Sequence, residues 1–141
     1  MRHRSNQDKG AALIEFAILM PILVLLLLGI VEFGWGLAQQ IDVRHKARET
    51  LRLAIVDEPQ ASIISRACEN DIVDAPDITE ILIETNVDPG TEAAVTVTAN
   101  VEQITGLFSA FWGPAPTISS RVEGRVEQES TAFVAGSYTC P

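Results

Sequence analysis

The hydrophobic pattern of the chain is dominated by one uninterrupted apolar run near its amino terminus. From Ala11 to Val31 the sequence holds 21 residues with a single charge, Glu15. A helix rises about 1.5 Å per residue, so this run would be roughly 31 Å long, which matches the hydrocarbon thickness of a bilayer. The pattern therefore predicts a transmembrane helix over residues 11–33.

After Gly34 the pattern becomes amphipathic. Between residues 34 and 57, apolar side chains recur at helical spacing on one side, at Val43, Ala47, Leu51, Ala54 and Ile55. We therefore expect the helix to continue as an amphipathic extension to about Asp57. This extension also carries a basic cluster made of Arg44, His45, Lys46, Arg48 and Arg52. The cluster is either a solvated helix face or a surface that pairs with acidic surfaces of neighbouring molecules.

The sequence of residues 58–141 predicts one small domain that begins with a short helix. The acids and proline at Asp57-Glu58-Pro59 suit a first helical turn, and the helix should run to about Glu69. Four residues are expected to share its buried face: Ala61, Ile64, Ala67 and Cys68.

The rest of this domain alternates between apolar and polar positions, as strands do. Strands are predicted around residues 81–84, 95–101 and 118–127, and Asp88-Pro89-Gly90 is a strong turn signal between the first two. The tail after these strands has no interpretable pattern. The predicted fold class is α+β, with the long amino-terminal helix packed on a small antiparallel sheet of about three strands that has one solvated face.

Charge asymmetry indicates the orientation in the membrane. Three basic residues, Arg2, Arg4 and Lys9, oppose one acid, Asp8, before the apolar run, and such short basic flanks stay in the cytoplasm. Residues 1–10 are therefore predicted to be a cytoplasmic leader, in which residues 1–9 have no fold of their own, and residues 58–141 an external domain. A secretory signal peptide fits less well, because the run is too long and contains Glu15.

The net charge of −9 and the two cysteines refine this view. Residues 1–10 carry +2, so the remainder carries −11, and such an acidic chain is not expected to bind nucleic acid. Cys68 and Cys140 both fall on the predicted external side, where disulfides persist. A bridge would close a loop of 73 residues, counting both cysteines, and would stabilise the domain by roughly 4 kcal/mol. Unpaired thiols or an intermolecular bond are the alternative.

Two further stretches each admit two interpretations. Asp71, Asp74 and Asp77 either hold a hard cation such as calcium or belong to a solvated acidic loop, and their spacing does not match a calcium loop. The aromatic stretch from Leu107 to Trp112 either folds over the sheet or forms an exposed patch that docks a partner or lies on the membrane.

Catalytic chemistry is not expected from this sequence. It contains no G-x-S-x-G, H-E-x-x-H, C-x-x-C or phosphate-loop motif, and its two histidines, His3 and His45, are predicted on opposite sides of the membrane. No catalytic residue, metal site or cofactor is predicted, and the chain is not expected to be an enzyme.

The single charge in the apolar run needs an explanation. A carboxylate inside a membrane helix costs on the order of 3 kcal/mol, and such groups usually have a charged partner. If the chain were cut between Gly10 and Ala11, the new amino group would be a cation at membrane depth. The Glu15 of a neighbouring copy could then neutralise it.

The string GAALIEFAILMPILVLLLLGIVEFG, which starts at Gly10, resembles the processing site and helix of type IV pilin precursors. Glu15-Phe16, Pro21 and the closing Val31-Glu32-Phe33-Gly34 are similar to TadE-like pseudopilins of tight-adherence (Tad, or Flp) pilus systems. The resemblance covers about residues 9–50 and implies a pilin-like fold, cleavage between Gly10 and Ala11 by a prepilin peptidase, and subunit docking through Glu15 and Phe16.

The resemblance also implies the place of the protein in the cell. It implies a single-pass protein of the bacterial inner membrane whose partners are other pilin and pseudopilin subunits and the pilus assembly platform, in a system for adherence or secretion. Ala11 stands where many type IV pilins begin with an aromatic residue or methionine, and Tad major pilins are much shorter than this chain. A minor pseudopilin is therefore favoured.

Two other functions stay open from the sequence. One is a single-pass anchored protein that is never cleaved and whose domain binds a ligand or scaffolds an envelope complex. The other is a secreted soluble domain. The mature amino terminus separates the three: Ala11 for the pseudopilin, Met1 for the uncleaved anchor, and a start near Gln39 for secretion.

Overall fold

The computed structural model describes residues 6–56, 58–69, 76–85, 88–106, 109–110, 113–114, 116–127 and 135–140. Two helices and four strands occur in these ranges: α1 (Asn6–Ile55), α2 (Gln60–Cys68), β1 (Asp77–Thr85), β2 (Glu92–Asn100), β3 (Thr117–Arg125) and β4 (Gly136–Thr139). The chain divides into two compact units, Met1–Gly34 and Trp35–Pro141. The fold class is α+β, as predicted.

The boundaries of α1 differ from those expected. It begins at Asn6, so the expectation that residues 1–9 have no fold is wrong for Asn6–Lys9. Asparagine suits a helix start, and glutamine and lysine are good helix formers, so this segment extends the apolar helix at little cost. At its other end α1 stops at Ile55, two residues before the predicted limit.

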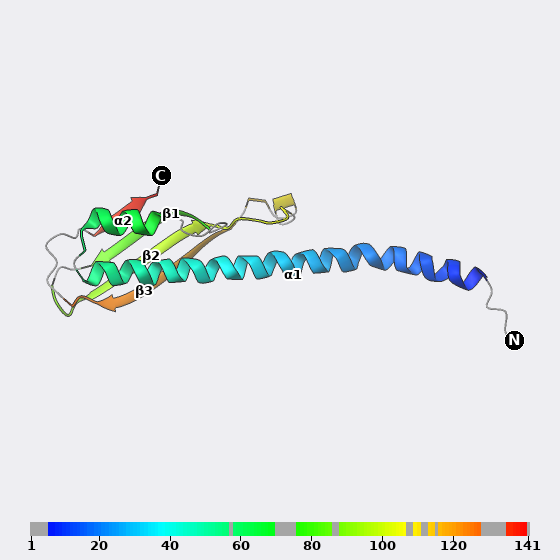
Figure 1. The fold of residues 1–141 in the computed structure, drawn as a ribbon, viewed down its shortest axis with the longest axis horizontal. Coiled ribbons are helices and arrows are strands. Elements are labelled where there is room, and N and C mark those ends of the chain that lie inside the picture. Colours follow the sequence, from blue (N-terminus) through cyan, green and yellow to red (C-terminus); the bar gives the residue numbers. More distant parts are fainter. Residues whose placement is uncertain are drawn as a thin grey trace. The chain divides into compact units, whose positions relative to one another are not determined.

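The sheet is antiparallel, with strand order β3-β2-β1-β4 (Figure 1). The prediction of about three strands missed β4, which spans only four residues and pairs with β1. So short a strand has no recognisable alternation of its own, and its conformation is set by the neighbour that it pairs with. The predicted turn between β1 and β2 contains Gly90, whose positive φ of 85° favours a glycine.

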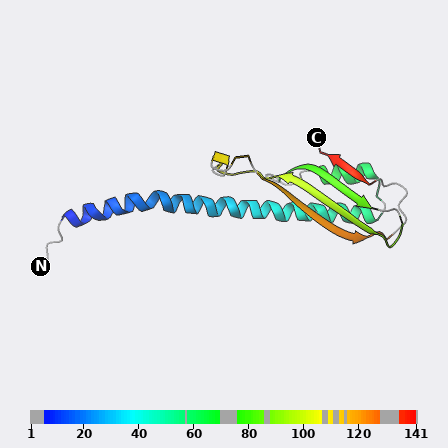
Figure 2. The same ribbon diagram turned by 180° about the vertical axis from the view of Figure 1, so that it is seen from behind.

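Both helices of the Trp35–Pro141 unit lie on one face of the sheet, the inner face, and Figure 2 looks at the opposite, outer face. In β1, Ile81 and Ile83 point to the inner face and are at most 1% exposed, whereas Glu80 and Glu84 on the outer face are exposed. The predicted solvated face of the sheet is therefore confirmed.

The hydrophobic core lies between the inner face and the two helices. Complete burial of an aliphatic side chain of this size contributes about 1.5–3 kcal/mol. From α1 the core receives Val43, Ala47, Leu51 and Ala54, which confirms the predicted apolar stripe. From the rest of the chain it receives Ile63, Ala67, Ile78, Ile81, Ile83, Ala93, Val95, Val97, Ala99 and Val126.

The predicted buried face of α2 is confirmed at Ala67, and Cys68 packs against the core, but the prediction is wrong at the start of the helix. Ile63 and Ala67 are buried, whereas Ala61 is exposed and Ile64 is only half-buried. Because α2 has only nine residues, its apolar positions fit two neighbouring helix faces almost equally well. Two links described below select the buried face of α2. Gln60 bonds to Tyr138 of β4, and Cys68 bonds to Cys140, the residue after β4.

A close approach between α1 and β3 occurs at Gly124. A Cβ placed on this glycine would lie 3.1 Å from Cδ2 of Leu51, closer than ordinary van der Waals contact. The missing side chain lets Leu51 lie directly against the strand. This contact fixes the carboxyl-terminal part of α1, residues 35–55, on the edge strand β3. We call this part the outer half of α1.

Candidate functional site

The Met1–Gly34 unit presents its apolar side chains outward in the single chain. Leu13, Phe16 and Phe33 are 69%, 61% and 70% exposed. From Gly10 onward α1 is long and apolar enough to cross a membrane, with a mean hydropathy of 2.8 over its best 18 residues, none of them buried. Side chains of this kind require lipid or other apolar helices around them.

The predicted processing and docking residues all lie in this exposed part of α1. Gly10, Ala11, Glu15 and Phe16 are exposed, and a Cβ on Gly10 would meet no atom within 4 Å. Packing within the chain therefore does not require glycine at position 10. Ala11 and Glu15 are four residues apart, so they lie on the same side of the helix one turn apart.

In the other unit, a buried amide joins α1 to the segment after β2. Gln39, 1% exposed, donates through Nε2 to the carbonyl oxygen of Glu102 at 2.7 Å, and its Oε1 accepts from the backbone N–H of Glu102 at 2.8 Å. The side-chain amide thus satisfies both backbone groups of one residue, as a neighbouring strand would. We call this pair of hydrogen bonds the Gln39 clamp.

The predicted basic cluster separates into two roles. Lys46 is half-buried and its Nζ donates to the carbonyl oxygen of Arg66 at 3.4 Å, near the carboxyl end of α2. A cation there complements the negative end of the helix dipole. Lys46 therefore has a structural role between the two helices. The remaining members, Arg44, His45, Arg48 and Arg52, are exposed.

A disulfide joins α2 to the residue after β4. Cys68 and Cys140 are bonded, with their Cα atoms 5.4 Å apart. At the other end of α2, Gln60 donates to the hydroxyl of Tyr138, which lies in β4. These two links attach both ends of α2 to the short edge strand.

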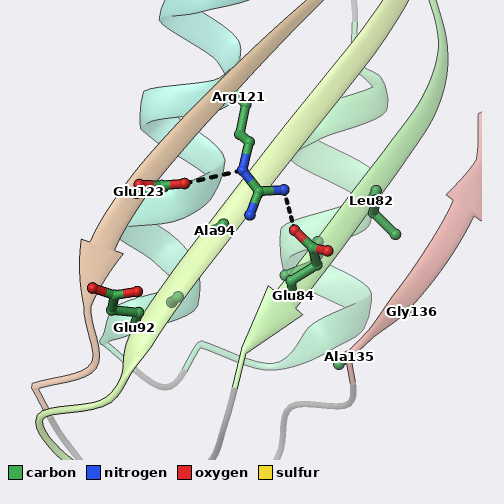
Figure 3. Close-up of a pocket in the computed structure, with 10 residues that line it drawn as sticks. Leu82, Glu84, Glu92, Ala94, Arg121, Glu123, Ala135 and Gly136 are labelled. Carbon is green, nitrogen blue, oxygen red and sulfur yellow. Dashed lines mark hydrogen bonds and ion pairs between the residues drawn. The ribbon is translucent and has the colours of Figure 1, made fainter.

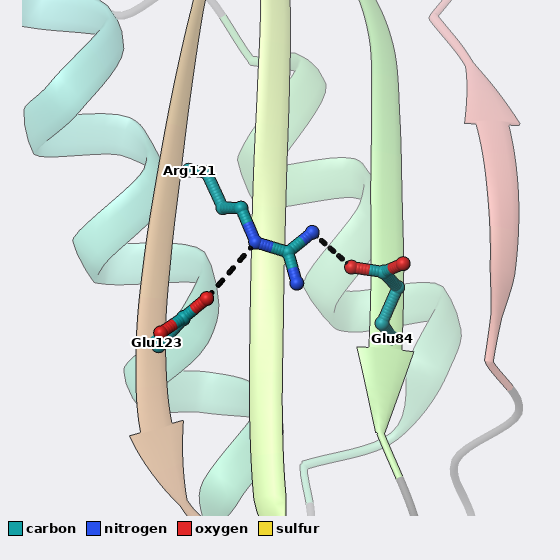
Figure 4. Close-up of polar contacts among 3 residues, drawn as sticks. All are labelled: Glu84, Arg121 and Glu123. Atoms are coloured by element: carbon teal, nitrogen blue, oxygen red, sulfur yellow. Dashed lines mark hydrogen bonds and ion pairs between the residues drawn. The ribbon is translucent and has the colours of Figure 1, made fainter.

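On the outer face, Arg121 links β3 to β1 across β2 (Figure 4). It extends from β3 across β2 and donates through Nε to Glu123 at 3.1 Å and through an Nη to Glu84 of β1. The hydrogen bonds to Glu123 and Glu84 raise the pKa of the Arg121 guanidinium. A raised pKa means that these bonds favour the folded state at every pH below the ordinary value for arginine, which includes the whole physiological range.

A shallow hollow of about 620 Å³ lies on the outer face, and the three residues of this network are part of its lining (Figure 3). Leu82 and Ala94 are among its apolar lining residues. Its charged lining consists of Glu84, Glu92, Glu123 and Arg121. Three carboxylates against one guanidinium leave two negative charges, and we call this surface the acidic hollow.

The two open interpretations of the sequence fall partly outside the described residues. Asp71 and Asp74 lie outside them, and Asp77 is exposed at the start of β1. The described part of the chain contains no group of three or more side chains suited to hold a metal ion. Of the stretch from Leu107 to Trp112, only Ser109 and Ala110 are described, and both are exposed.

Sequence reasoning missed the most buried polar residues of α1. Gln39 and Thr50 are each 1% exposed, and the Thr50 hydroxyl donates to the Lys46 carbonyl at 2.8 Å. A signal existed for Gln39, because it precedes Val43 by the same four residues that separate Val43 from Ala47. Its position in the buried stripe was visible, but its partner was not.

The comparisons with known proteins bear on the amino-terminal part of the chain. The family model described as TadE-like protein matches residues 10–52. The chain matches no curated protein and no solved structure. The matched range starts at Gly10 and includes Glu15, Phe16, the apolar run and most of the outer half of α1. Over residues 10–52 the chain is similar to TadE-like proteins, which confirms the predicted resemblance in that range.

Proposed function

We infer that the chain is a minor pseudopilin that, after leader cleavage, takes part in assembling a Tad-type pilus for adherence or secretion. The observation that carries this inference is the exposed apolar helix whose sequence matches TadE-like proteins. The 18 most hydrophobic consecutive residues of this helix are not buried by the rest of the chain, so lipid or other helices must cover them. A pilus subunit meets both environments, first in the inner membrane and then among its neighbours.

Cleavage is proposed between Gly10 and Ala11 by a prepilin peptidase on the cytoplasmic side. The bond lies in α1, whose backbone is hydrogen-bonded internally, so a peptidase must first unwind it. Glycine weakens a helix by about 1 kcal/mol relative to alanine, which makes Gly10 the natural point of unwinding. Packing within the described chain does not account for this glycine, which supports a role in recognition by the enzyme.

Docking between subunits is proposed to use Glu15 and Phe16. The new amine of Ala11 would be a cation in a medium of low dielectric constant, where an opposite charge is favoured. Phe16, which follows Glu15 and is exposed, would pack against neighbouring helices. Other pilin and pseudopilin subunits and the assembly platform are thus the proposed partners, and neither catalysis nor a cofactor forms part of the proposal.

Sequencing the amino terminus of the protein recovered from its own cells tests the proposal. We expect the mature chain to start at Ala11. A Gly10→Val variant should accumulate uncleaved, whereas Ser5→Val, a matched change in the leader, should be processed normally. A natural protein that still starts at Met1 in piliated cells would overturn the pseudopilin function and favour the anchored alternative.

Substitution of the membrane carboxylate tests docking separately. We expect Glu15→Gln to insert in the membrane but to reduce piliation at least tenfold, because the amide removes the charge and keeps the shape. Glu49→Gln, an exposed site on the outer half of α1, serves as the control and should leave piliation unchanged. Normal piliation of Glu15→Gln cells by electron microscopy would contradict the docking role.

One observation favours the second candidate, an uncleaved anchored protein that binds a ligand or scaffolds an envelope complex. The acidic hollow is a concave surface on the solvated face of the sheet, and it carries a net negative charge. In that case the mature chain would keep Met1, and binding to the hollow would be the main activity of the domain.

A further inference from the structure

The outer half of α1 has a second side, distinct from the one that packs on the sheet. Spacings of four, three, four and four residues place five side chains on this side, and we call them the exposed stripe: Leu37, Ile41, Arg44, Arg48 and Arg52. All five are exposed, and the two apolar members are 47% and 56% exposed.

Charge is segregated around this helix. Asp42 lies about a third of a turn from the exposed stripe, and Glu49 lies beside it, within reach of Arg52 but not between the arginines. Lys46, which contacts α2, is also outside the stripe. The stripe therefore presents an apolar start followed by three positive charges in a row.

The rest of the domain has the opposite charge. Residues 35–56 contain four basic and two acidic residues, whereas residues 57–141 contain three basic and 14 acidic residues. On the outer face, the lining of the acidic hollow retains two negative charges after Arg121 is counted. Arg125, which lies opposite Glu92 in the β2–β3 ladder, reduces the local excess to one negative charge. The hollow also has an apolar lining at Leu82 and Ala94, so it complements the stripe in both charge and polarity.

We propose that the exposed stripe of one copy docks in the acidic hollow of a second copy. The proposal rests on the pseudopilin function and names the surfaces by which the external domains would associate. Glu84 and Glu123 both neighbour Ala94 across the ladder, so they lie two strand spacings, about 10 Å, apart. Arg44 and Arg52 are about 12 Å apart along the helix, so each guanidinium can reach a separate carboxylate.

The placement of the two surfaces determines the kind of assembly. The stripe belongs to α1, which covers the inner face of the sheet, and the hollow lies on the outer face. A copy whose stripe is occupied still offers its hollow to the next copy. Such a contact joins two different surfaces, and it extends into an open array unless the rotation between copies closes a ring.

Zero-length crosslinking of the full chain in detergent tests this contact. Arg48→Lys keeps the charge and supplies an amine that a carbodiimide joins to a carboxylate within direct contact distance. At low salt we expect a covalent dimer whose crosslinked peptides join position 48 to Glu84, Glu92 or Glu123. The control is Glu49→Lys, which places the amine on the neighbouring side of the helix, and Lys9 and Lys46 give the same background in both variants.

Three results would support the proposal together. The crosslink from position 48 should fall about tenfold in about 1 M salt, where the Debye length is about 3 Å. It should fall similarly when Glu84, Glu92 and Glu123 are changed to glutamine. The Glu49→Lys control should give no such crosslink.

Other results would overturn it. These are a monomer, a salt-resistant dimer, or a crosslink from position 48 to carboxylates outside the hollow. If one of these crosslinking results occurred and the mature chain started at Ala11, the docking proposal would be wrong but the pseudopilin function would still hold. A mature terminus at Met1 would remove that function whatever the crosslinks show.

Discussion

Gln39 connects two segments of the chain that are far apart in sequence. Its amide satisfies both backbone groups of Glu102, 63 residues away, and lies within the buried stripe of α1. Helical periodicity could place Gln39 on the packed side, four residues before Val43. It could not identify Glu102, because a backbone partner has no side-chain signature in the sequence. The Gln39 clamp is thus the part of the fold least accessible to pattern reasoning.

Removal of the Gln39 clamp should destabilise the domain measurably. We expect Gln39→Ala to lower the free energy of unfolding by about 2–3 kcal/mol, because two hydrogen bonds are lost and Glu102 keeps partly buried backbone groups without a partner. The control Gln40→Ala, at the exposed neighbour, should change it by less than about 0.5 kcal/mol. Urea unfolding of the full chain in detergent measures both, and equal effects would contradict the clamp.

The close contact at Gly124 supports a second prediction at the residue scale. Gly124→Val should destabilise the domain by about 1–3 kcal/mol, because the new side chain overlaps Leu51 and forces α1 away from β3. Ser119→Val in the same strand points to the outer face and should be nearly neutral, since strands accept β-branched residues. Thermal unfolding followed by circular dichroism compares the two, and a neutral Gly124→Val would show that Leu51 relocates freely.

At the scale of elements, β4 depends on its attachments more than on its own sequence. It has four residues, pairs only with β1 among the described strands, and is linked to α2 through Cys68–Cys140 and Gln60–Tyr138. The strands β1, β2 and β3 alternate clearly enough to be predicted, since each has nine residues. The short β4 and the exact face of α2 required tertiary contacts.

Loss of the disulfide should therefore affect one edge of the sheet first. We expect Cys68→Ser with Cys140→Ser to lower the stability of the domain by about 2–4 kcal/mol. Hydrogen exchange should show lost protection at Ser137 and Tyr138, while the β1–β2 ladder keeps its protection. Wild-type protein kept reduced is the matched control and should behave alike. Uniform loss across all four strands would contradict an effect local to β4.

At the scale of the whole molecule, the two units differ in what their residues contact. The buried hydrophobic residues of the described part all lie between Val43 and Val126, within the Trp35–Pro141 unit. The hydrophobic pattern was enough to separate the apolar run from the rest of the chain. The lone charge of Glu15 and the resemblance to pilin precursors led to the prediction of processing at Gly10 and Ala11 and of docking at Glu15 and Phe16. The acidic hollow depends on the register of three strands, so it was not predicted.

This division predicts that the Trp35–Pro141 unit folds without residues 1–34. Residues 35–141 exported to an oxidising compartment should give a soluble domain with one disulfide and a cooperative unfolding transition, because its core needs nothing from residues 1–34. The same fragment with Cys68→Ser and Cys140→Ser is the control and should unfold at a lower temperature. A fragment that aggregates or melts without cooperativity would contradict an independent core.

The strand order β3-β2-β1-β4 also has a consequence for biogenesis. β1 pairs with β2 through a short local connection. The other edge of β1 pairs with β4, which is synthesised after β3. Non-local pairing of this kind is slow, and an uncovered strand edge can capture a strand from another chain. The risk of strand exchange during folding is therefore greatest before β4 pairs with β1, and formation of the Cys68–Cys140 bond ends that interval.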